Sequence, residues 1–181
     1  MLGMVFTEFL EMIEQRYSPE LADQILTETQ LANDGAYTAV GYYPHEEMLA
    51  LVTALSRHTG SSVAELVQAY GEHLFQRFVA LYPQMFQDRD DAFSLLARVD
   101  GQIHQEVRKL YPQAQLPSFE IAEHTERRLV LIYRSSRPLA DLAEGLIRAC
   151  IQHYRQPLQL QREDLPAEAG GSAARFELFR P

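Results

Sequence analysis

The spacing of apolar residues changes at one point of this 181-residue chain, near Pro117. Before Pro117 the apolar side chains recur every three or four residues, which is typical of amphipathic helices. After it, the segments SFEIAEH and RRLVLIY alternate with a period of two on either side of Thr125-Glu126, which predicts a β-hairpin. A helix over about 139–154 and a strand pair around 169–172 follow. The predicted fold is therefore α+β, with helices first and then a small antiparallel sheet of about four strands with one long helix inserted.

The helical part divides at capping and turn residues. Ser18-Pro19 is typical of a helix start, because serine caps free N–H groups and proline fits the first turn. Thr59-Gly60-Ser61-Ser62 is expected to end one helix and cap the next. We expect a single domain over 1–181, with an N-terminal helical subdomain to about residue 60, a second subdomain over 61–181 and no output domain. The pattern predicts helices over about 6–17, 19–31, 45–59, 63–81 and 92–111, with a polar link at 88–91.

Charge and cysteine content exclude several classes of protein. The net charge of −9 argues against a nucleic-acid partner, because phosphate binding needs a clustered basic surface. The single cysteine, Cys150, excludes an internal disulfide and a metal site built from several cysteines. Glu8, Glu11 and Glu14 interrupt the apolar N-terminal segment, which is therefore unlike a signal peptide, and no stretch is long and apolar enough to span a membrane. We expect a cytoplasmic protein.

The predicted helix over 92–111 carries a histidine on an apolar surface. At about 100° per residue, His104 lies on one shoulder of the apolar stripe, beside Phe93 and Tyr111. A core histidine with one hydrogen-bond partner would explain this position, and so would a single axial metal ligand. No other histidine, cysteine or acid follows three or four residues later, and a zinc site would need more ligands. If His104 binds a metal, the pattern favours a haem, where one histidine can suffice.

A polar face ends the predicted strand RRLVLIY. Side chains two residues apart share a face of a strand, so Tyr133, Ser135 and Arg137 should project together after Leu129 and Leu131. A strand that simply leaves the sheet, with Arg137 in solvent, would explain this pattern. So would anion capture, because two hydroxyl groups and a planar guanidinium suit a carboxylate or a phosphate. A haem has two propionates and an apolar ring, and would account for both this face and His104.

With their flanking segments, these residues resemble the H-NOX family, the haem nitric oxide/oxygen binding domains related to the sensor domain of soluble guanylate cyclase. The resemblance covers essentially the whole chain and is carried by MLGMVF, AYTAVG, YGEHLFQRF, IHQEVRKLYPQAQLPSF and YRSSRPLADLAEGL. It implies that Tyr133, Ser135 and Arg137 form the family's Tyr-x-Ser-x-Arg propionate motif. It also implies that His104 is the proximal ligand of a haem b (iron protoporphyrin IX).

The same resemblance implies how the rest of the site is built. The haem would be buried between the two subdomains, with Pro117 pressing on it and Gly71 on the helix over its distal face. Some members have a tyrosine five residues after the motif arginine, where this chain has Leu142. An asparagine three residues after the distal glycine is replaced by Leu74. The resemblance therefore implies an entirely apolar distal wall, made of Val5, Phe9, Leu74, Phe78 and Leu142.

An apolar wall favours a sensor of nitric oxide, and of carbon monoxide, that excludes oxygen. Oxygen gains about 1–3 kcal/mol from a buried hydrogen-bond donor, whereas the other two gases gain much less. The resemblance further implies that nitric oxide weakens the bond between the iron and His104 and so shifts the protein between two states. Because no output domain is expected, the signal would pass to a separate partner, a histidine kinase or a cyclic-di-GMP enzyme.

Three alternatives stay open. A haem enzyme such as a peroxidase would need a polar acid–base pair on the distal side, and His73 is the nearby candidate. An oxygen-binding member of the family would need a distal donor such as Tyr70. A haem-free adaptor would keep the fold for protein contacts alone. The structural zinc site that some members build from several cysteines is not expected here, because Cys150 is the single cysteine.

Overall fold

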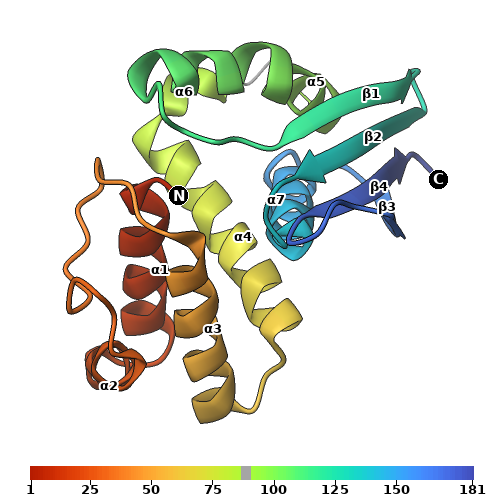
Figure 1. The fold of residues 1–181 in the computed structure, drawn as a ribbon. Coiled ribbons are helices and arrows are strands. Elements are labelled where there is room, and N and C mark those ends of the chain that lie inside the picture. The colour runs from red at the N-terminus through yellow and green to blue at the C-terminus, as the bar shows by residue number, and fades with distance from the viewer. Residues whose placement is uncertain (87–90) are drawn as a thin grey trace.

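The structure is a computed structural model that describes residues 1–86 and 91–181. Its N-terminal part is a bundle of helices around one apolar core (Figure 1). One of these helices, α4, is longer than the others and runs diagonally from the bundle toward the rest of the molecule. The bounds of the four helices are Gly3–Arg16 for α1, Pro19–Thr29 for α2, His45–Thr59 for α3 and Val63–Leu81 for α4.

Local sequence signals set the ends of these helices. The Ser18 hydroxyl accepts a hydrogen bond from the Leu21 N–H at 3.2 Å and so caps α2. Ser62 and Glu65 form a capping box at the start of α4, in which each side chain binds the other residue's backbone N–H. Gly60 ends α3 with a φ of +75°, in the left-handed region that glycine adopts without steric cost.

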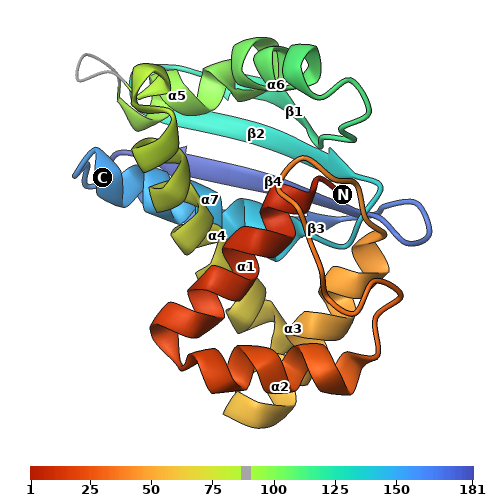
Figure 2. The same cartoon turned by 90° about the vertical axis from the view of Figure 1, so that its left-hand side faces the viewer.

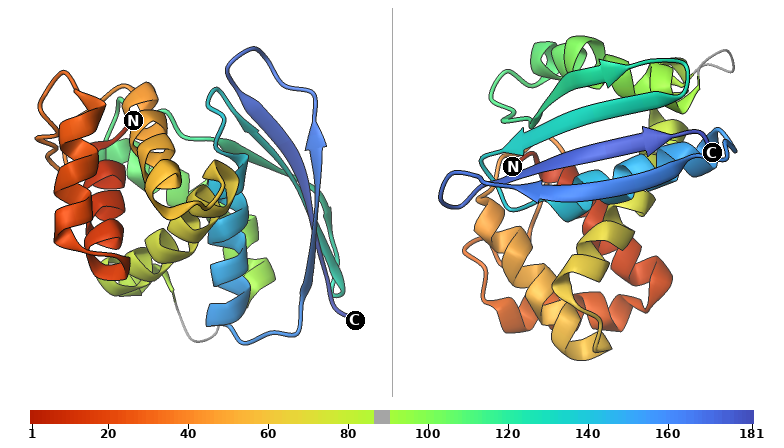
Figure 3. Two further views of the ribbon diagram at one scale, coloured as in Figure 1. Left: turned by 90° about the horizontal axis from the view of Figure 1, so that it is seen from below. Right: turned by 90° about the vertical axis from the view of Figure 1, so that its right-hand side faces the viewer.

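The C-terminal part is an antiparallel sheet with helix α7 (Ala140–His153) against one face (Figure 3). The predicted hairpin and the predicted last strand pair are both present, and the α+β fold class is confirmed. Leu129, Leu131 and Tyr133 are buried in the core between the sheet and α7. The strands are β1 (Ser118–His124), β2 (Arg128–Ser135), β3 (Gln159–Leu165) and β4 (Ser172–Phe179), in the spatial order β1-β2-β4-β3.

Two glycines allow α4 and α7 to cross at close range. A Cβ on Gly71 would overlap the backbone carbonyl of Leu142, and one on Gly145 would overlap that of Gln68. Glycine has no Cβ, so the two backbones can approach where any other residue would hold them apart. α4 also contributes side chains to the apolar cores of both parts. The subdomain boundary near residue 60 stays a prediction.

The segment over 92–111 is not the single regular helix that the sequence predicted. α5 (Ala92–Arg98) passes into a π-helical turn, η2 (Val99–Ile103), and then into α6 (His104–Leu110). These elements lie together beside β1 and β2 (Figure 2). In the π turn, the His104 N–H binds the Val99 carbonyl five residues earlier. The extra residue in this turn changes the direction in which α6 presents its side chains, which a fixed helical period cannot predict.

The end of α4 also differs from the prediction. Leu81, expected in the apolar stripe, is 45% exposed, because it is the last residue of the helix and lies beyond the core. The 3₁₀ turn η1 (Pro83–Met85) follows it. Most of the polar link predicted at 88–91 falls outside the described residues. None of the helices within 1–86 and 91–181 is long and apolar enough to cross a membrane.

Candidate functional site

A cavity of about 310 Å³ lies between the helical bundle and the sheet. Its walls come from α1, α4, α7, the stretch from α5 to α6, and the strands β1 and β2. This volume is in the range of small-molecule sites, which are mostly apolar with a few convergent polar groups. The wall follows this pattern, because apolar side chains dominate it. Its polar side chains include Tyr82, His104, Gln115, Tyr133, Ser135 and Arg137.

His104 lines this cavity from the first residue of α6. Its side chain is 13% exposed, and burial lowers the pKa of its imidazole. A neutral imidazole is the form that binds a metal. Among the described residues, no group of three or more His, Cys, Asp or Glu is placed to hold a metal ion. The donor set therefore suits a cofactor that needs one protein ligand, such as a haem, rather than an ion held by several side chains.

The Nδ1 atom of His104 lies 3.3 Å from Oδ1 of Asp100, which belongs to the π turn. A carboxylate can only accept a hydrogen bond, so this contact needs the proton on Nδ1. Nε2 is then left with the lone pair that a metal ligand requires. The sequence did not predict this contact: the residues three and four positions after His104 include no ligand, and the acid stands four residues before it.

Tyr133, Ser135 and Arg137 line the same cavity as His104. Tyr133 is buried, and burial raises the pKa of its hydroxyl, which therefore keeps its proton. β2 ends at Ser135, so the period of two accounts for Tyr133 and Ser135 but does not extend to Arg137. A turn brings Arg137 back to the cavity. The Ser135 hydroxyl accepts a hydrogen bond from the Arg137 backbone N–H at 3.1 Å. The Ser172 hydroxyl donates a hydrogen bond to the Arg137 backbone carbonyl at 2.7 Å.

Four of the five residues expected in the distal wall line the cavity, and Phe9 does not. Val5 reaches the cavity from the start of α1, whereas Phe9 lies one turn further along, about 6 Å away along the axis. Phe9 is fully buried in the core of the bundle, with its ring 5.1 Å from that of Tyr70. Gly71 is not part of the wall either, because it lies at the crossing of α4 and α7. The residues found in the wall are Val5, Leu74, Phe78 and Leu142, together with Pro117.

The two polar residues considered for the distal side lie outside the cavity wall. Tyr70 is buried, and its hydroxyl donates to the Val5 carbonyl at 2.5 Å. His73 lies between α1 and α4, with Nε2 3.9 Å from the Glu8 carboxylate. Neither side chain lines the cavity. Neither the oxygen donor suggested at Tyr70 nor the acid–base group suggested at His73 therefore faces the cavity.

Sequence reasoning missed Tyr82 and Phe119, which both line the cavity. Tyr82 follows the last residue of α4, where the helical period no longer applies, and its hydroxyl donates to the Met4 sulfur at 3.9 Å. Phe119 pairs with Tyr133 across β1 and β2, and their ring centroids are 5.3 Å apart. The register of the predicted hairpin could have placed Phe119, because directly paired residues share a face of the sheet.

Known proteins resemble this chain over most of its length. A sequence model of the family described as Haem-NO-binding matches residues 2–162. An Fe(II) unliganded H-NOX protein from K. algicida is 33% identical, with a TM-score of 0.90 over 100% of this chain and 98% of that one. A mutant H-NOX protein from the same organism, also Fe(II) and unliganded, is 35% identical, with a TM-score of 0.92 over 100% and 97% of the two chains.

A third similar structure was solved with a gas ligand. The IWP-051-bound H-NOX from Shewanella woodyi, in the Fe(II)CO ligation state, is 36% identical to this chain. Its TM-score is 0.83, and the match covers 100% of this chain and 95% of that one. The family match over residues 2–162 and these three structures lead to one conclusion: the chain belongs to the Haem-NO-binding family, the H-NOX domains.

Proposed function

We propose that this protein senses nitric oxide, and carbon monoxide, at a ferrous haem b held by His104, and that it excludes oxygen. H-NOX domains are haem-based sensors of diatomic gases. A ferrous haem with one histidine ligand supplies an iron atom with an open sixth position for a gas. In this account Tyr133, Ser135 and Arg137 bind the propionates, and the apolar wall covers the ring.

The observation that carries the proposal is the placement of two kinds of group around one cavity. His104 offers a largely buried, neutral imidazole whose Nδ1 is already engaged by Asp100. Tyr133 and Arg137 line the same cavity and offer a hydroxyl and a guanidinium to an anion. A ligand that combines a metal, an apolar body and carboxylates matches this set, and haem has all three.

Selection among gases is attributed to the distal wall. Val5, Leu74 and Leu142 offer no hydrogen-bond donor from their side chains. The Tyr82 hydroxyl donates to the Met4 sulfur. A buried donor would favour oxygen by about 1–3 kcal/mol, and this wall withholds that gain. Nitric oxide and carbon monoxide lose little by its absence. The Fe(II)CO state of the Shewanella woodyi protein supports carbon monoxide as a ligand here.

The signal would begin with the release of His104 from the iron. α6 starts at His104 and follows directly after the π turn, so release would free this helix and the segment that leads to Pro117. Two arrangements of this segment would provide the two states that a signal needs. We propose a separate protein as receiver, either a histidine kinase or a cyclic-di-GMP enzyme.

Absorption spectra of the purified, reduced protein test the proposal. We expect the Soret band of a five-coordinate high-spin haem, unchanged when the sample is exposed to air, and shifted by nitric oxide and by carbon monoxide. An oxygen complex that forms in air would contradict the selectivity. A colourless protein after haem supplementation would contradict the proposal as a whole and favour the haem-free adaptor.

A further inference from the structure

Asp100 is the acidic side chain that contacts His104 through Nδ1, at 3.3 Å. The imidazole is 13% exposed and the carboxylate 37%, so the contact lies at the edge of the cavity wall and is only partly screened by water. Charge-assisted hydrogen bonds of this kind are stronger than those between neutral groups. At 3.3 Å the contact is at the long end for a hydrogen bond, but an ionised acceptor beside a neutral imidazole favours the tautomer that carries its proton on Nδ1.

The backbone around the contact fixes where the carboxylate stands. Asp100 is the second residue of the π turn, and the His104 N–H closes this turn on the Val99 carbonyl. π turns inside α-helices occur frequently at functional sites. Here the π turn places Asp100 four residues before His104, so the two side chains come into contact within one continuous stretch of helix.

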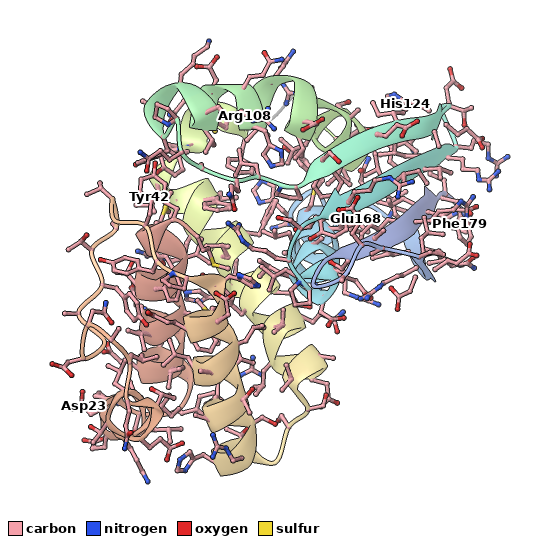
Figure 4. The ribbon with its side chains drawn as sticks, viewed as in Figure 1. Asp23, Tyr42, Arg108, His124, Glu168 and Phe179 are labelled. Atoms are coloured by element: carbon pink, nitrogen blue, oxygen red, sulfur yellow. The ribbon has the colours of Figure 1, made fainter. Side chains whose placement is uncertain are left out.

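Arg108 and the Pro117 carbonyl are the other groups that act on this pair. An Arg108 nitrogen lies 3.8 Å from the same Oδ1 of Asp100, one turn beyond His104 on α6, where Figure 4 labels it. Because Arg108 is 46% exposed, this pair adds only a weak, solvent-screened attraction to the carboxylate. The Pro117 carbonyl raises the pKa of the His104 imidazole through a hydrogen bond, as Asp100 does. It is the competing candidate for orienting the ring.

We infer that Asp100 is a positioning residue for His104, whose carboxylate keeps the proton on Nδ1 and so leaves Nε2 free to bind the iron. This inference rests on the proposed function for the role of Nε2, but the tautomer itself is a property of the chain alone. Carboxylates that orient metal-binding histidines in this way also make them stronger ligands. Asp100 would thus set how firmly His104 holds the iron, and how easily a gas releases it.

The first test reads the tautomer directly, by long-range ¹H–¹⁵N NMR of the His104 ring in the full chain before haem is added. We expect the proton on Nδ1 in the wild type and in Glu106→Ala, which removes an exposed carboxylate from the same helix. In Asp100→Ala we expect the proton to move to Nε2. An Asp100→Ala ring that stays protonated on Nδ1 would overturn the inference and leave the Pro117 carbonyl as the group that orients the ring. A wild-type ring protonated on Nε2 would also overturn it, because Asp100 would then not hold the proton on Nδ1.

The second test uses the haem-loaded protein. Resonance Raman of the ferrous form should show the iron–histidine band at lower frequency in Asp100→Ala than in Glu106→Ala. Haem should also dissociate about 10-fold faster, in line with the effect of removing such carboxylates elsewhere. Asp100→Asn keeps a hydrogen-bond acceptor but loses the charge. Its iron–histidine frequency and haem dissociation rate should lie between those of Asp100→Ala and Glu106→Ala. This variant also serves as the test if Asp100→Ala folds poorly.

The outcomes separate this inference from the proposed function. An unchanged iron–histidine band in both Asp100 variants would overturn the positioning role while haem binding stands. A wild-type chain that binds no haem would instead overturn the proposed function. In that case the NMR result still decides whether Asp100 sets the tautomer of His104.

Discussion

The guanidinium of Arg137 donates two hydrogen bonds to Gln115, one to its backbone carbonyl at 2.9 Å and one to its side-chain oxygen at 2.8 Å. Gln115 lies in the segment between α6 and β1, two residues before Pro117. Arg137 therefore ties the polar end of the cavity to the segment that follows the helix of His104. A guanidinium has five N–H donors, so these two bonds leave others for an anion.

Gln115→Ala should speed the loss of haem, because Arg137 would keep one of its two bonds to this segment and would be oriented less firmly. We expect an increase of a few-fold in the rate of haem transfer to an acceptor protein such as apomyoglobin. Gln113→Ala is the matched control, since Gln113 is exposed on the same segment. Equal rates in the two variants would show that Gln115 does not orient Arg137.

Arg137→Ala should weaken haem retention far more than Arg134→Ala. Arg137 lines the cavity, whereas Arg134 is exposed on β2 and does not line it. The loss of a charge-assisted bond to a carboxylate is expected to cost about 1.5–3 kcal/mol, which corresponds to a ten-fold to hundred-fold faster loss. The same transfer assay measures both variants. Similar rates for the two would rule out Arg137 as a propionate ligand.

Leu142→Tyr, alone or with Leu74→Asn, should allow the ferrous protein to bind oxygen. Both positions line the cavity, and a hydroxyl at 142 would introduce the missing donor, with an asparagine amide as its partner. Overpacking by the larger ring costs about 1–3 kcal/mol, so Leu142→Phe is the control for volume. Stopped-flow spectra in oxygenated buffer should show a stable oxygen complex for the tyrosine variant only.

Two results would contradict this view of the distal wall. One is an oxygen complex in Leu142→Phe, which would attribute the effect to packing rather than to the hydroxyl. The other is an oxygen complex in the wild type that is lost in Tyr82→Phe. This result would identify the Tyr82 hydroxyl, now directed to the Met4 sulfur, as a working donor.

Gly145→Ala should destabilise the fold, because the new methyl group would overlap the backbone carbonyl of Gln68 where α7 crosses α4. Backbone cannot move aside as a flexible side chain can, so we expect the free energy of unfolding to fall by about 1–3 kcal/mol. Gly101→Ala is the control, since a Cβ there meets no atom within 4 Å. Urea unfolding followed by circular dichroism compares the two. An equal midpoint for both variants would mean that the crossing is not tightly packed.

The α+β fold could be predicted because it follows from local patterns. The caps at Ser18 and Ser62 and the change of period at Pro117 each act within a few residues of sequence. The position of Arg137 could be predicted only in part, because it lies beyond the end of β2. Its turn is held by Ser172, 35 residues further along the chain. No local sequence pattern predicts that hydrogen bond. The position of Arg137 at the cavity was therefore predicted from the resemblance to a known motif and not from the strand period alone.

The differences between the prediction and the structure have equally specific causes. Helical spacing puts Val5 and Phe9 on the same side of α1, but it does not tell how far along the helix the cavity extends. A regular period of about 100° per residue also cannot reveal a π turn, which inserts an extra residue before His104. The contact between Asp100 and His104 spans this turn and was likewise not predicted.

The central claim is that His104 is the protein ligand of the haem iron, and His104→Gly tests it most directly. Within the described residues, His104 is the one histidine that lines the cavity and no cysteine does, so the variant should bind no haem stably on its own. Free imidazole should fill the space left by the side chain and restore the five-coordinate absorption spectrum. If His104→Gly binds haem without imidazole and keeps the wild-type spectrum, His104 is not the ligand and the account is contradicted.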